Sequence, residues 1–391
     1  VVDEEGARVA ADQSPLALLR DGLRSGRDGN LDALSQLLDA DELGGLLFDT
    51  EIMASPEHID WLIARGANTE VRNDAGDTPL FALLSQVPAS LPALQSLLRH
   101  GVSPGGRGGL ARFLAACVRS DQAGRALEHC ALELLARGAD PFAASPEGDP
   151  ALTLVVRLGW NRVLEQLIAN GCDLDARDAH GMSALHLCAA LGREAALKTL
   201  LLHGAAVDLR AEEGQTPLGV ALASGRRDLA DWLDWRGWAL PGRRLDSSDV
   251  PLAATAGDVG AVRRLLDLGL AVDTIDNQGC TALLRAAGGG HRAVVDLLLD
   301  RGADPQHAAH SGATPLSAAV SMPQGDTVER LLQAGAALEQ RLPNDVTVLM
   351  LAAALGLPDL CARLLTAGAN VHATDSQGLT PLHCGGLPRL T

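Results

Sequence analysis

The residues in this chain whose types and spacing could do chemistry are runs of glycine, histidines and cysteines. Two glycine-rich runs, residues 105–109 and 288–290, have a composition that can cradle a phosphate. A phosphate-binding loop also needs Lys-Ser or Lys-Thr directly after its glycines and a place between a strand and a helix. Neither run has these features, so we interpret both as turns and expect no cofactor.

Histidines can bind metal ions or transfer protons, and the chain has 11 of them. His307 and His310 are close enough in sequence to chelate a metal, but no cysteine or carboxylate group joins them. His186 and His383 each follow a Ser or Thr that can start a helix, and we expect their rings to bond nearby backbone. No Ser-His-Asp or Cys-His arrangement can be argued. The sequence therefore predicts neither a metal site nor an enzyme.

The seven cysteines are odd in number and scattered, with no CxxC pair to suggest a zinc or redox motif. Cys172, Cys188 and Cys361 fall where neighbouring segments carry Ala, Val or Leu, so we interpret them as small buried apolar residues. Free thiols favour a reducing compartment. We expect a cytoplasmic location, with a periplasmic or secreted one left open.

Composition and charge narrow the class of protein. Of the 391 residues, 47% are hydrophobic but only 2% are aromatic, and there is no tyrosine. This favours thin layers of small residues over one aromatic-rich core. The net charge of −17 opposes binding to nucleic acid or to an anionic membrane and favours basic partners. No apolar run approaches the ~20 residues that cross a bilayer. The arginine-rich composition, with Lys198 as the single lysine, suggests a bacterial source with a GC-rich genome.

The elements that position these residues follow an internal repeat. A Thr/Ser-Pro/Ala-Leu triplet, or a weaker version of it, begins at residues 150, 183, 216, 248, 281, 314, 347 and 380. Every step is therefore 33 residues except one of 32. Such a constant register is typical of a stacked-repeat architecture.

Each unit has the pattern of two helices joined by a turn. The Thr or Ser can cap the first helix, and Pro fits its first turn. Paired small residues such as Ala286-Ala287 follow, then a glycine, then a second helix with paired apolar residues such as Leu298-Leu299. A polar stretch such as residues 178–181 predicts a hairpin turn into the next unit. The glycines expected to end the second helices in a left-handed conformation are Gly171, Gly204, Gly237, Gly269, Gly302, Gly335 and Gly368.

This unit resembles the ankyrin repeat, whose signature is Thr-Pro-Leu-His-x-Ala within 33 residues. Residues 380–383 (TPLH) and 183–186 (SALH) carry that signature, and residues 302–304 (GAD) carry the end of the unit. The resemblance covers about residues 12–391 and implies an all-α repeat solenoid of about ten stacked helix-turn-helix repeats with short β-hairpin loops.

We divide the chain into four parts. Residues 1–44 are interpreted as a polar N-terminus with degenerate capping helices, and residues 45–149 as irregular repeats with an insertion near residues 119–129. Residues 150–247 are regular repeats that end in an irregular junction, residues 239–247. Residues 248–391 are further repeats, of which the last is truncated.

Three tryptophans stand out just before that junction. Trp232, Trp235 and Trp238 fall within seven residues and are flanked by arginines. On a helix their spacing would place them on one face. Such a patch could be a binding hot spot, because Trp and Arg dominate interface energetics, or it could cover the adjacent irregular segment. We favour the covering role.

The resemblance implies a protein–protein interaction scaffold that binds through hairpin tips and the concave face of its inner helices, without catalysis. Mapped onto this chain, the inner-face candidates are Leu158, Leu191, Met322 and Leu355. The tip candidates are Arg177, His180, Arg210, Glu212 and Arg341, and the three tryptophans complete the set. We expect a monomer that binds another protein through a basic or amphipathic segment of that partner. The alternative is the recognition arm of a larger protein whose enzymatic or membrane-anchored part lies outside this chain.

Overall fold

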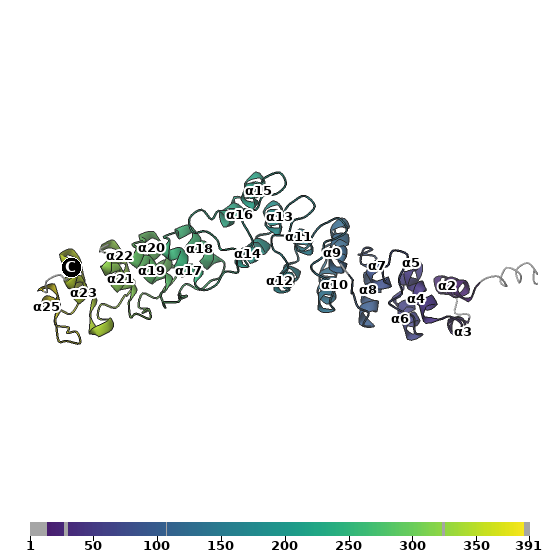
Figure 1. Cartoon of the computed structure of the whole chain (residues 1–391), viewed down its shortest axis with the longest axis horizontal. Coiled ribbons are helices and arrows are strands. Elements are labelled where there is room, and N and C mark those ends of the chain that lie inside the picture. The colour runs from purple at the N-terminus through teal and green to yellow at the C-terminus, as the bar shows by residue number, and fades with distance from the viewer. Residues whose placement is uncertain (1–13, 27–29, 107, 323–324, 387–391) are drawn as a thin grey trace, which may run out of the picture. The chain divides into compact units, whose positions relative to one another are not determined.

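A computed structural model describes residues 14–26, 30–106, 108–322 and 325–386, and the regular structure in them is helical (Figure 1). Contacts divide the chain into two units. The first comprises Val1–Leu201 with Ala205–Ala230, and the second comprises Leu202–Gly204 with Asp231–Thr391. Each unit is a stack of short helices.

Helix pairs succeed one another through the first unit. As far as residue 233 the helices are α2 (Pro15–Ser25), α3 (Leu31–Ser35), α4 (Ala40–Gly45), η1 (Leu46–Phe48), α5 (Thr50–Met53), α6 (Pro56–Ala64), α7 (Pro79–Leu83), α8 (Leu91–Arg99), α9 (Gly109–Arg119), α10 (Arg125–Ala136), α11 (Ala151–Leu158), α12 (Asn161–Ala169), α13 (Ala184–Leu191), α14 (Glu194–Leu202), α15 (Pro217–Ala223) and α16 (Arg227–Leu233). Helices α9 and α10 have 11 and 12 residues, against 8 and 9 in α11 and α12. The extra residues near 119–129 thus lengthen one helix pair.

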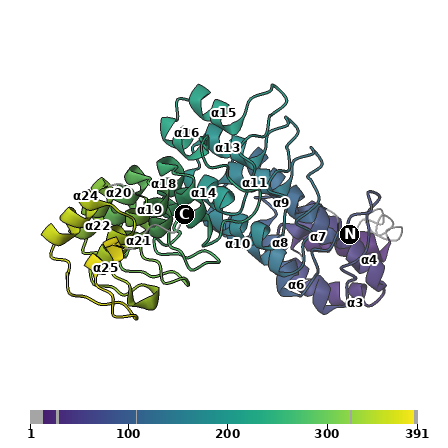
Figure 2. The same cartoon turned by 60° about the vertical axis from the view of Figure 1, so that its left-hand side comes forward.

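The second unit repeats one helix pair with little variation. Its helices are α17 (Asp249–Thr255), α18 (Val259–Asp267), α19 (Ala282–Gly289), α20 (Arg292–Asp300), α21 (Pro315–Ser321), α22 (Gly325–Gln333), η2 (Pro343–Asp345), α23 (Val348–Ala354), α24 (Pro358–Thr366) and α25 (Pro381–Gly386). The inner helices α17, α19, α21, α23 and α25 contact one another in that order (Figure 1). The outer helices α18, α20, α22 and α24 do the same (Figure 2). The predicted all-α repeat solenoid is confirmed.

Threonines begin the inner helices, as the sequence predicts. The hydroxyl oxygens of Thr216, Thr281, Thr314 and Thr347 accept hydrogen bonds of 3.2–3.3 Å from the backbone N–H three residues further on. Each bond satisfies one of the free N–H groups at a helix start and contributes about 1 kcal/mol. The recurrence of this cap explains why the helices start in the same register.

Alanine and leucine form the core between the helices. Ala286 and Ala287 of α19 and Leu298 of α20 are at most 1% exposed. In the second unit one continuous hydrophobic cluster runs from Leu245 to Ala369. Small residues let the inner helices approach closely, while leucines fill the space between inner and outer helices. The stack therefore buries a large apolar area with few aromatic side chains.

The loops from one helix pair to the next are hairpin turns with little strand pairing. In the second unit they project beside the helices (Figure 2). Within the described residues the β-contacts are two isolated antiparallel bridges, Arg177–Ser183 and Ile275–Thr281. The short β-hairpins expected from the sequence are therefore reduced to single bridges.

The chain departs from the repeat between α16 and α17. The N–H of Leu245 donates to the carbonyl of Leu202 at 2.8 Å, and the backbone of Arg243 crosses so near Gly204 that a side chain there would clash. Gly237 does not have a positive φ, so its predicted role as a left-handed helix end is wrong. Instead, the carboxylate of Asp258 occupies the place that a Cβ of residue 237 would take.

Candidate protein-binding surfaces

An Asp or Asn side chain holds several of the hairpins in shape. One oxygen of Asp178 accepts hydrogen bonds from the N–H groups of His180 and Met182, both at 2.9 Å. Its other oxygen accepts a bond of 2.6 Å from Arg157. The same two-bond turn recurs at Asn73, Asp276 and Asp375. These four hairpins are thereby ordered before any partner arrives, which lowers the entropy cost of binding.

The tip arginines brace these hairpins. Arg210 Nη1 donates to the carbonyl of Gly214 at 3.0 Å, and Arg177 Nη1 donates to the carbonyl of Arg210 in the next hairpin at 2.7 Å. Arg341 makes both kinds of bond, at 2.7 and 2.9 Å. All three side chains are exposed, but each has part of its donor capacity engaged with backbone.

The inner-face candidates separate into exposed and buried residues. Leu191, Met322 and Leu355, at the ends of α13, α21 and α23, are 44%, 45% and 41% exposed. Leu158, at the end of α11, is only 8% exposed. It lies in the core and is not available to a partner.

Two exposed leucines were not assigned a binding role by the sequence pattern. Leu222 on α15 is 57% exposed and Leu252 on α17 is 47% exposed. Leu222 occupies the repeat position of Ala287, which is 1% exposed. A leucine where other units carry a small residue is the signal that could have identified it.

A hollow of about 300 Å³ lies between consecutive hairpins of the first unit; we call it the hairpin groove. It is lined by His180, Met182, Ala211, Glu212, Glu213, Gln215 and Val220. Two predicted tip residues, His180 and Glu212, are therefore brought together. A Cβ on Gly181 would lie 2.9 Å from the backbone nitrogen of Glu212, so glycine is what lets the two hairpins stack this closely.

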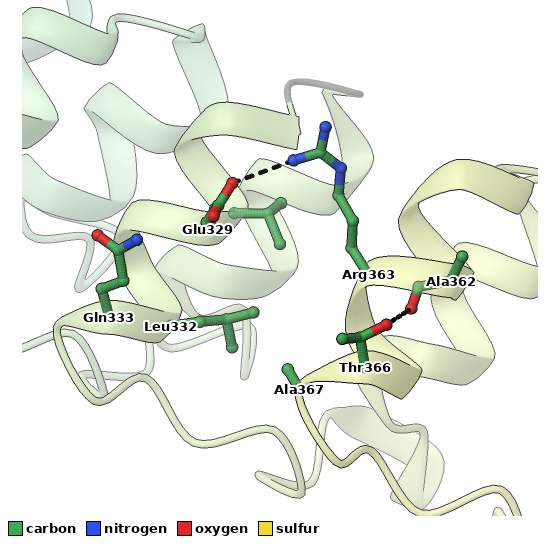
Figure 3. Close-up of a pocket in the computed structure, with 8 residues that line it drawn as sticks. Glu329, Leu332, Gln333, Ala362, Arg363, Thr366 and Ala367 are labelled. Atoms are coloured by element: carbon green, nitrogen blue, oxygen red, sulfur yellow. Dashed lines mark hydrogen bonds and ion pairs between the residues drawn. The ribbon is translucent and has the colours of Figure 1, made fainter.

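A second hollow, of about 400 Å³, lies between the outer helices α22 and α24 (Figure 3). It is lined by Val328, Glu329, Leu332, Gln333, Ala362, Arg363, Thr366 and Ala367. An ion pair of 3.1 Å between Glu329 and Arg363 crosses it. Between α20 and α22, Arg330 instead reaches two acceptors, Asp296 at 3.1 Å and Asp300 at 2.7 Å. The two charged residues that line the hollow thus pair with each other, and most of its other lining residues are apolar.

Comparison with models of known protein families identifies the type of repeat. The model described as ankyrin repeats (3 copies) matches residues 122–211, 152–234 and 251–341, and the single ankyrin repeat model matches residues 344–376. Together the matches span more than half of the chain. The chain belongs to the ankyrin-repeat family. No curated protein matches it. Ankyrin repeats are in general protein–protein interaction modules and typically have no catalytic activity of their own.

The tryptophans lie where the ankyrin register is interrupted. Trp232 is in the last turn of α16, but Trp235 and Trp238 follow the helix, so the expected common helical face is wrong. The Nε1 of Trp235 donates to the carbonyl of Trp232 at 2.7 Å. The rings of Trp235 and Trp238 are 6.1 Å apart, and both pack on the core of the second unit. This packing supports the covering role over the hot-spot role.

Polar groups anchor the same segment. The N–H of Trp238 donates to Asp258 at 2.7 Å, and the guanidinium of Arg264 lies 5.3 Å from the Trp235 ring centre. Burial pushes the pKa of Asp258 upward, but hydrogen bonds from Ala261 and Trp238 and the Arg264 charge together hold that pKa below its ordinary value. The ionised side chain of Asp258 therefore holds the irregular segment against the rest of the second unit.

The His186 ring stabilises the contact between neighbouring ankyrin repeats. His186 Nδ1 accepts from the N–H of Ser183 at 3.2 Å, and its Nε2 lies 3.0 Å from the carbonyl of Gln215 in the next repeat. Burial lowers the pKa of His186, so the neutral ring makes these bonds. The prediction that His186 bonds backbone is confirmed.

All seven cysteines are free thiols. Burial raises the pKa of Cys117, Cys130 and Cys188 to about 12 and that of Cys172 to about 11, so these thiols are protonated and unreactive at neutral pH. Cys188 is buried as predicted, whereas Cys172 and Cys361 are partly exposed.

The part of the chain that the structure describes contains no group of three or more His, Cys, Asp or Glu side chains placed to hold a metal ion. In the same residues, no helix combines the length and apolarity needed to cross a membrane.

Proposed function

We propose that this ankyrin-repeat chain binds a partner protein through its hairpin tips and the inner face of its helices. The observation that carries the proposal is the exposure of large apolar side chains at the ends of inner helices. Met322 and Leu355 occupy the same position in neighbouring repeats, whose inner helices are in contact, and both are more than 40% exposed. Single exposed leucines are ordinary, whereas large apolar side chains exposed at the same position of neighbouring repeats favour an interface.

The charge of the chain indicates the kind of partner. With a net charge of −17, the protein attracts basic surfaces and repels acidic ones at long range. We propose a partner segment that is basic or amphipathic, bound by a monomer of this chain. Association should slow as ionic strength rises, because salt screens such steering.

The test is affinity capture from source-cell lysate with three variant baits besides the wild type. One carries Leu191→Glu and Leu222→Glu, the second carries Met322→Glu and Leu355→Glu, and the control carries Leu365→Glu. Leu365 lies on the outer helix α24 and is 44% exposed, which matches the exposure of the inner-face leucines. We expect a partner that is retained by the wild type and the control and lost from at least one inner-face variant.

Circular dichroism and thermal unfolding of each bait separate lost binding from lost folding. Equal retention by wild type and both inner-face variants would remove the inner face as the binding surface. Light scattering after size-exclusion chromatography checks the expected monomer.

A further inference from the structure

We propose that the hairpin groove of the first unit binds the side chain of an arginine or lysine in the partner segment. This proposal rests on the proposed function, because it names the chemistry that one part of the binding surface recognises. The groove is a surface hollow between residues 178–183 and 211–216, open to an extended segment that lies across the hairpins.

The floor of the groove is apolar. Met182, Ala211 and Val220 line it, and Val220 is only 8% exposed. Arginine and lysine carry aliphatic stems that pack on apolar surface while the charged head stays at the edge. A hollow of about 300 Å³ has room for such a stem.

The rim of the groove is negative. Glu212 and Glu213 are both exposed and line it. Neither carboxylate makes an ion pair or a side-chain hydrogen bond with any residue that the structure describes. The acidic residue of the adjacent hairpin, Asp178, is by contrast already paired with Arg157. Two carboxylates next to an apolar floor are therefore free to accept a cationic donor.

The arginines of the same hairpins do not neutralise this rim. Arg177 and Arg210 do not line the groove, and both donate to backbone carbonyls instead. Among the lining residues, Glu212 and Glu213 carry the formal negative charges, and none of the others is a lysine or an arginine. The local charge of the groove lining is therefore negative.

Other occupants fit less well. An acidic side chain would meet like charge, and an apolar side chain would strip water from two carboxylates without replacing their hydrogen bonds. An arginine or lysine head forms charge-assisted hydrogen bonds with them. The floor selects a long stem and the rim selects a positive end.

The chain offers a direct reporter for this groove. Its four methionines are Met53, Met182, Met322 and Met350. Met182 lines the groove, Met53 and Met350 are 4% and 1% exposed, and Met322 is exposed in the other unit. Methyl NMR with ¹³C-methionine can therefore follow one signal in the site, two fold markers and one marker of non-specific binding.

The experiment titrates the full chain with the peptide Ac-Ala-Arg-Ala-NH₂ and with matched peptides that carry citrulline or norleucine at the centre. We expect the arginine peptide to shift the Met182 signal in a saturable way. The citrulline peptide, which lacks the charge, should bind about tenfold more weakly, as should the norleucine peptide. Met322 should not follow the same curve.

Two charge-matched variants complete the test. Glu212→Gln with Glu213→Gln should weaken arginine-peptide binding about tenfold. Glu57→Gln with Glu165→Gln removes the same charge from exposed positions outside the groove and should leave binding unchanged. Unshifted Met53 and Met350 signals show that each variant is folded.

Three results would overturn the proposal: no saturable shift of Met182, equal binding of the citrulline or norleucine peptide, or equal weakening by both variants. The capture experiment decides the proposed function separately. Partner loss from the inner-face variants without arginine binding in the groove would leave the scaffold function standing and remove only the basic specificity.

Discussion

Two junctions between neighbouring hairpins, one in each unit, follow the same backbone plan and present different surfaces. In the first unit, residues 178–183 and 211–216 enclose the hairpin groove. In the second unit, the corresponding hairpins start at Asp276 and Ala309, and Cys280, Leu284 and Ala309 pack there into a small buried cluster. We call the first junction open, because it leaves a hollow at the surface, and the second closed, because buried side chains fill it.

The difference lies in a few side chains at matching repeat positions. Met182 corresponds to Cys280, Glu212 to His310, and Val220 to Ala318. In the closed junction the His310 ring covers Gly279, and the His310 N–H donates to the carbonyl of Gln278 at 3.1 Å.

His307 adds a ring contact of 3.1 Å to the carbonyl of Gly279 in the closed junction. The second unit therefore uses these positions for cohesion between repeats, whereas in the first unit the same positions line the hairpin groove. Repeat architecture sets the backbone, and the variable side chains decide whether a junction is open or closed.

If only the surfaces differ, the cores beneath the two junctions must be equivalent. Leu200 and Leu298 occupy the same repeat position, and both are 0% exposed. We expect Leu200→Ala and Leu298→Ala each to lower the free energy of unfolding by about 2–5 kcal/mol. Because each repeat contacts only its neighbours, hydrogen exchange should rise first in the repeats around the substitution. A uniform rise along the chain, or a large gap between the two costs, would break the comparison.

Substitution of glycines by alanine tests how closely neighbouring hairpins approach each other. Gly181, Gly279 and Gly214 have positive φ values of 70°, 73° and 79°, so alanine at any of them costs about 1–2 kcal/mol of left-handed strain. At Gly214 no atom lies within 4 Å of the added Cβ, at Gly279 the His310 ring does, and at Gly181 the backbone nitrogen of Glu212 does.

A ring can turn aside more easily than a backbone can move. We therefore expect the destabilisation to rise from Gly214→Ala to Gly279→Ala to Gly181→Ala, with about 1–3 kcal/mol added by the clash. Urea unfolding of the three variants gives the order. A Gly181→Ala variant as stable as Gly214→Ala would show that the first junction is looser than described.

Acid should loosen the closed junction. Burial pushes the pKa of Asp276 upward, but hydrogen bonds from Arg285, Cys280 and Gln278 hold that pKa below its ordinary value. A lowered folded-state pKa means that the ionised side chain contributes stability above the ordinary carboxyl pKa of about 4. That contribution is lost as pH falls through the lower value in the folded protein.

We expect Asp276→Asn to lower stability by about 1 kcal/mol at pH 7, because the charged partner of Arg285 is removed. The gap between wild type and variant should close on the acid side of pH 4. Denaturant unfolding from pH 7 to the acid side of pH 4 measures this difference in stability. A difference that does not depend on pH would contradict the stabilising role of ionised Asp276.

The rate of thiol labelling should differ between the open and the closed junction. We expect the substitution needed for this test to change the stability of the protein little. Cys280 is 6% exposed, and burial raises its pKa. A Met182→Cys variant places a thiol at the matching position of the open junction. We expect it to react with a thiol reagent at pH 8 at least about tenfold faster than Cys280, since reactivity follows exposure and thiolate content. Peptide mass spectrometry resolves the two sites, and Cys188 gives the buried baseline. Equal rates would mean that the groove is closed in solution.

Much of the fold could be read from the sequence because it depends on local chemistry. Capping threonines, paired small residues and leucine pairs recur in register, and the structure places them at helix starts and in the core. The ring of His186 bonds backbone for the same reason, since its helix position brings it against the next repeat. Gly237 and the face shared by the tryptophans were predicted wrongly, because the register breaks between α16 and α17.

The binding surface was harder to predict. Leu158 and Leu191 occupy the same repeat position, yet one is 8% and the other 44% exposed. Exposure depends on which side chains the neighbouring repeats bring to that point, and a single-repeat pattern holds no such information. Leu222 differs in this respect, because a leucine at a position where other units carry a small residue is a signal that the sequence itself contains.

The sequence by itself determined that this chain is a stack of ankyrin repeats, because a periodic signal of caps, small residues and leucines specifies each helix pair locally. Tertiary structure alone decided which side chains of those repeats are exposed and which junctions between hairpins are open. The hairpin groove exists because Gly181 lets Glu212 approach while Met182 and Val220 leave space beneath it. That outcome depends on side chains about 30 residues apart meeting across two hairpins, which no local pattern specifies.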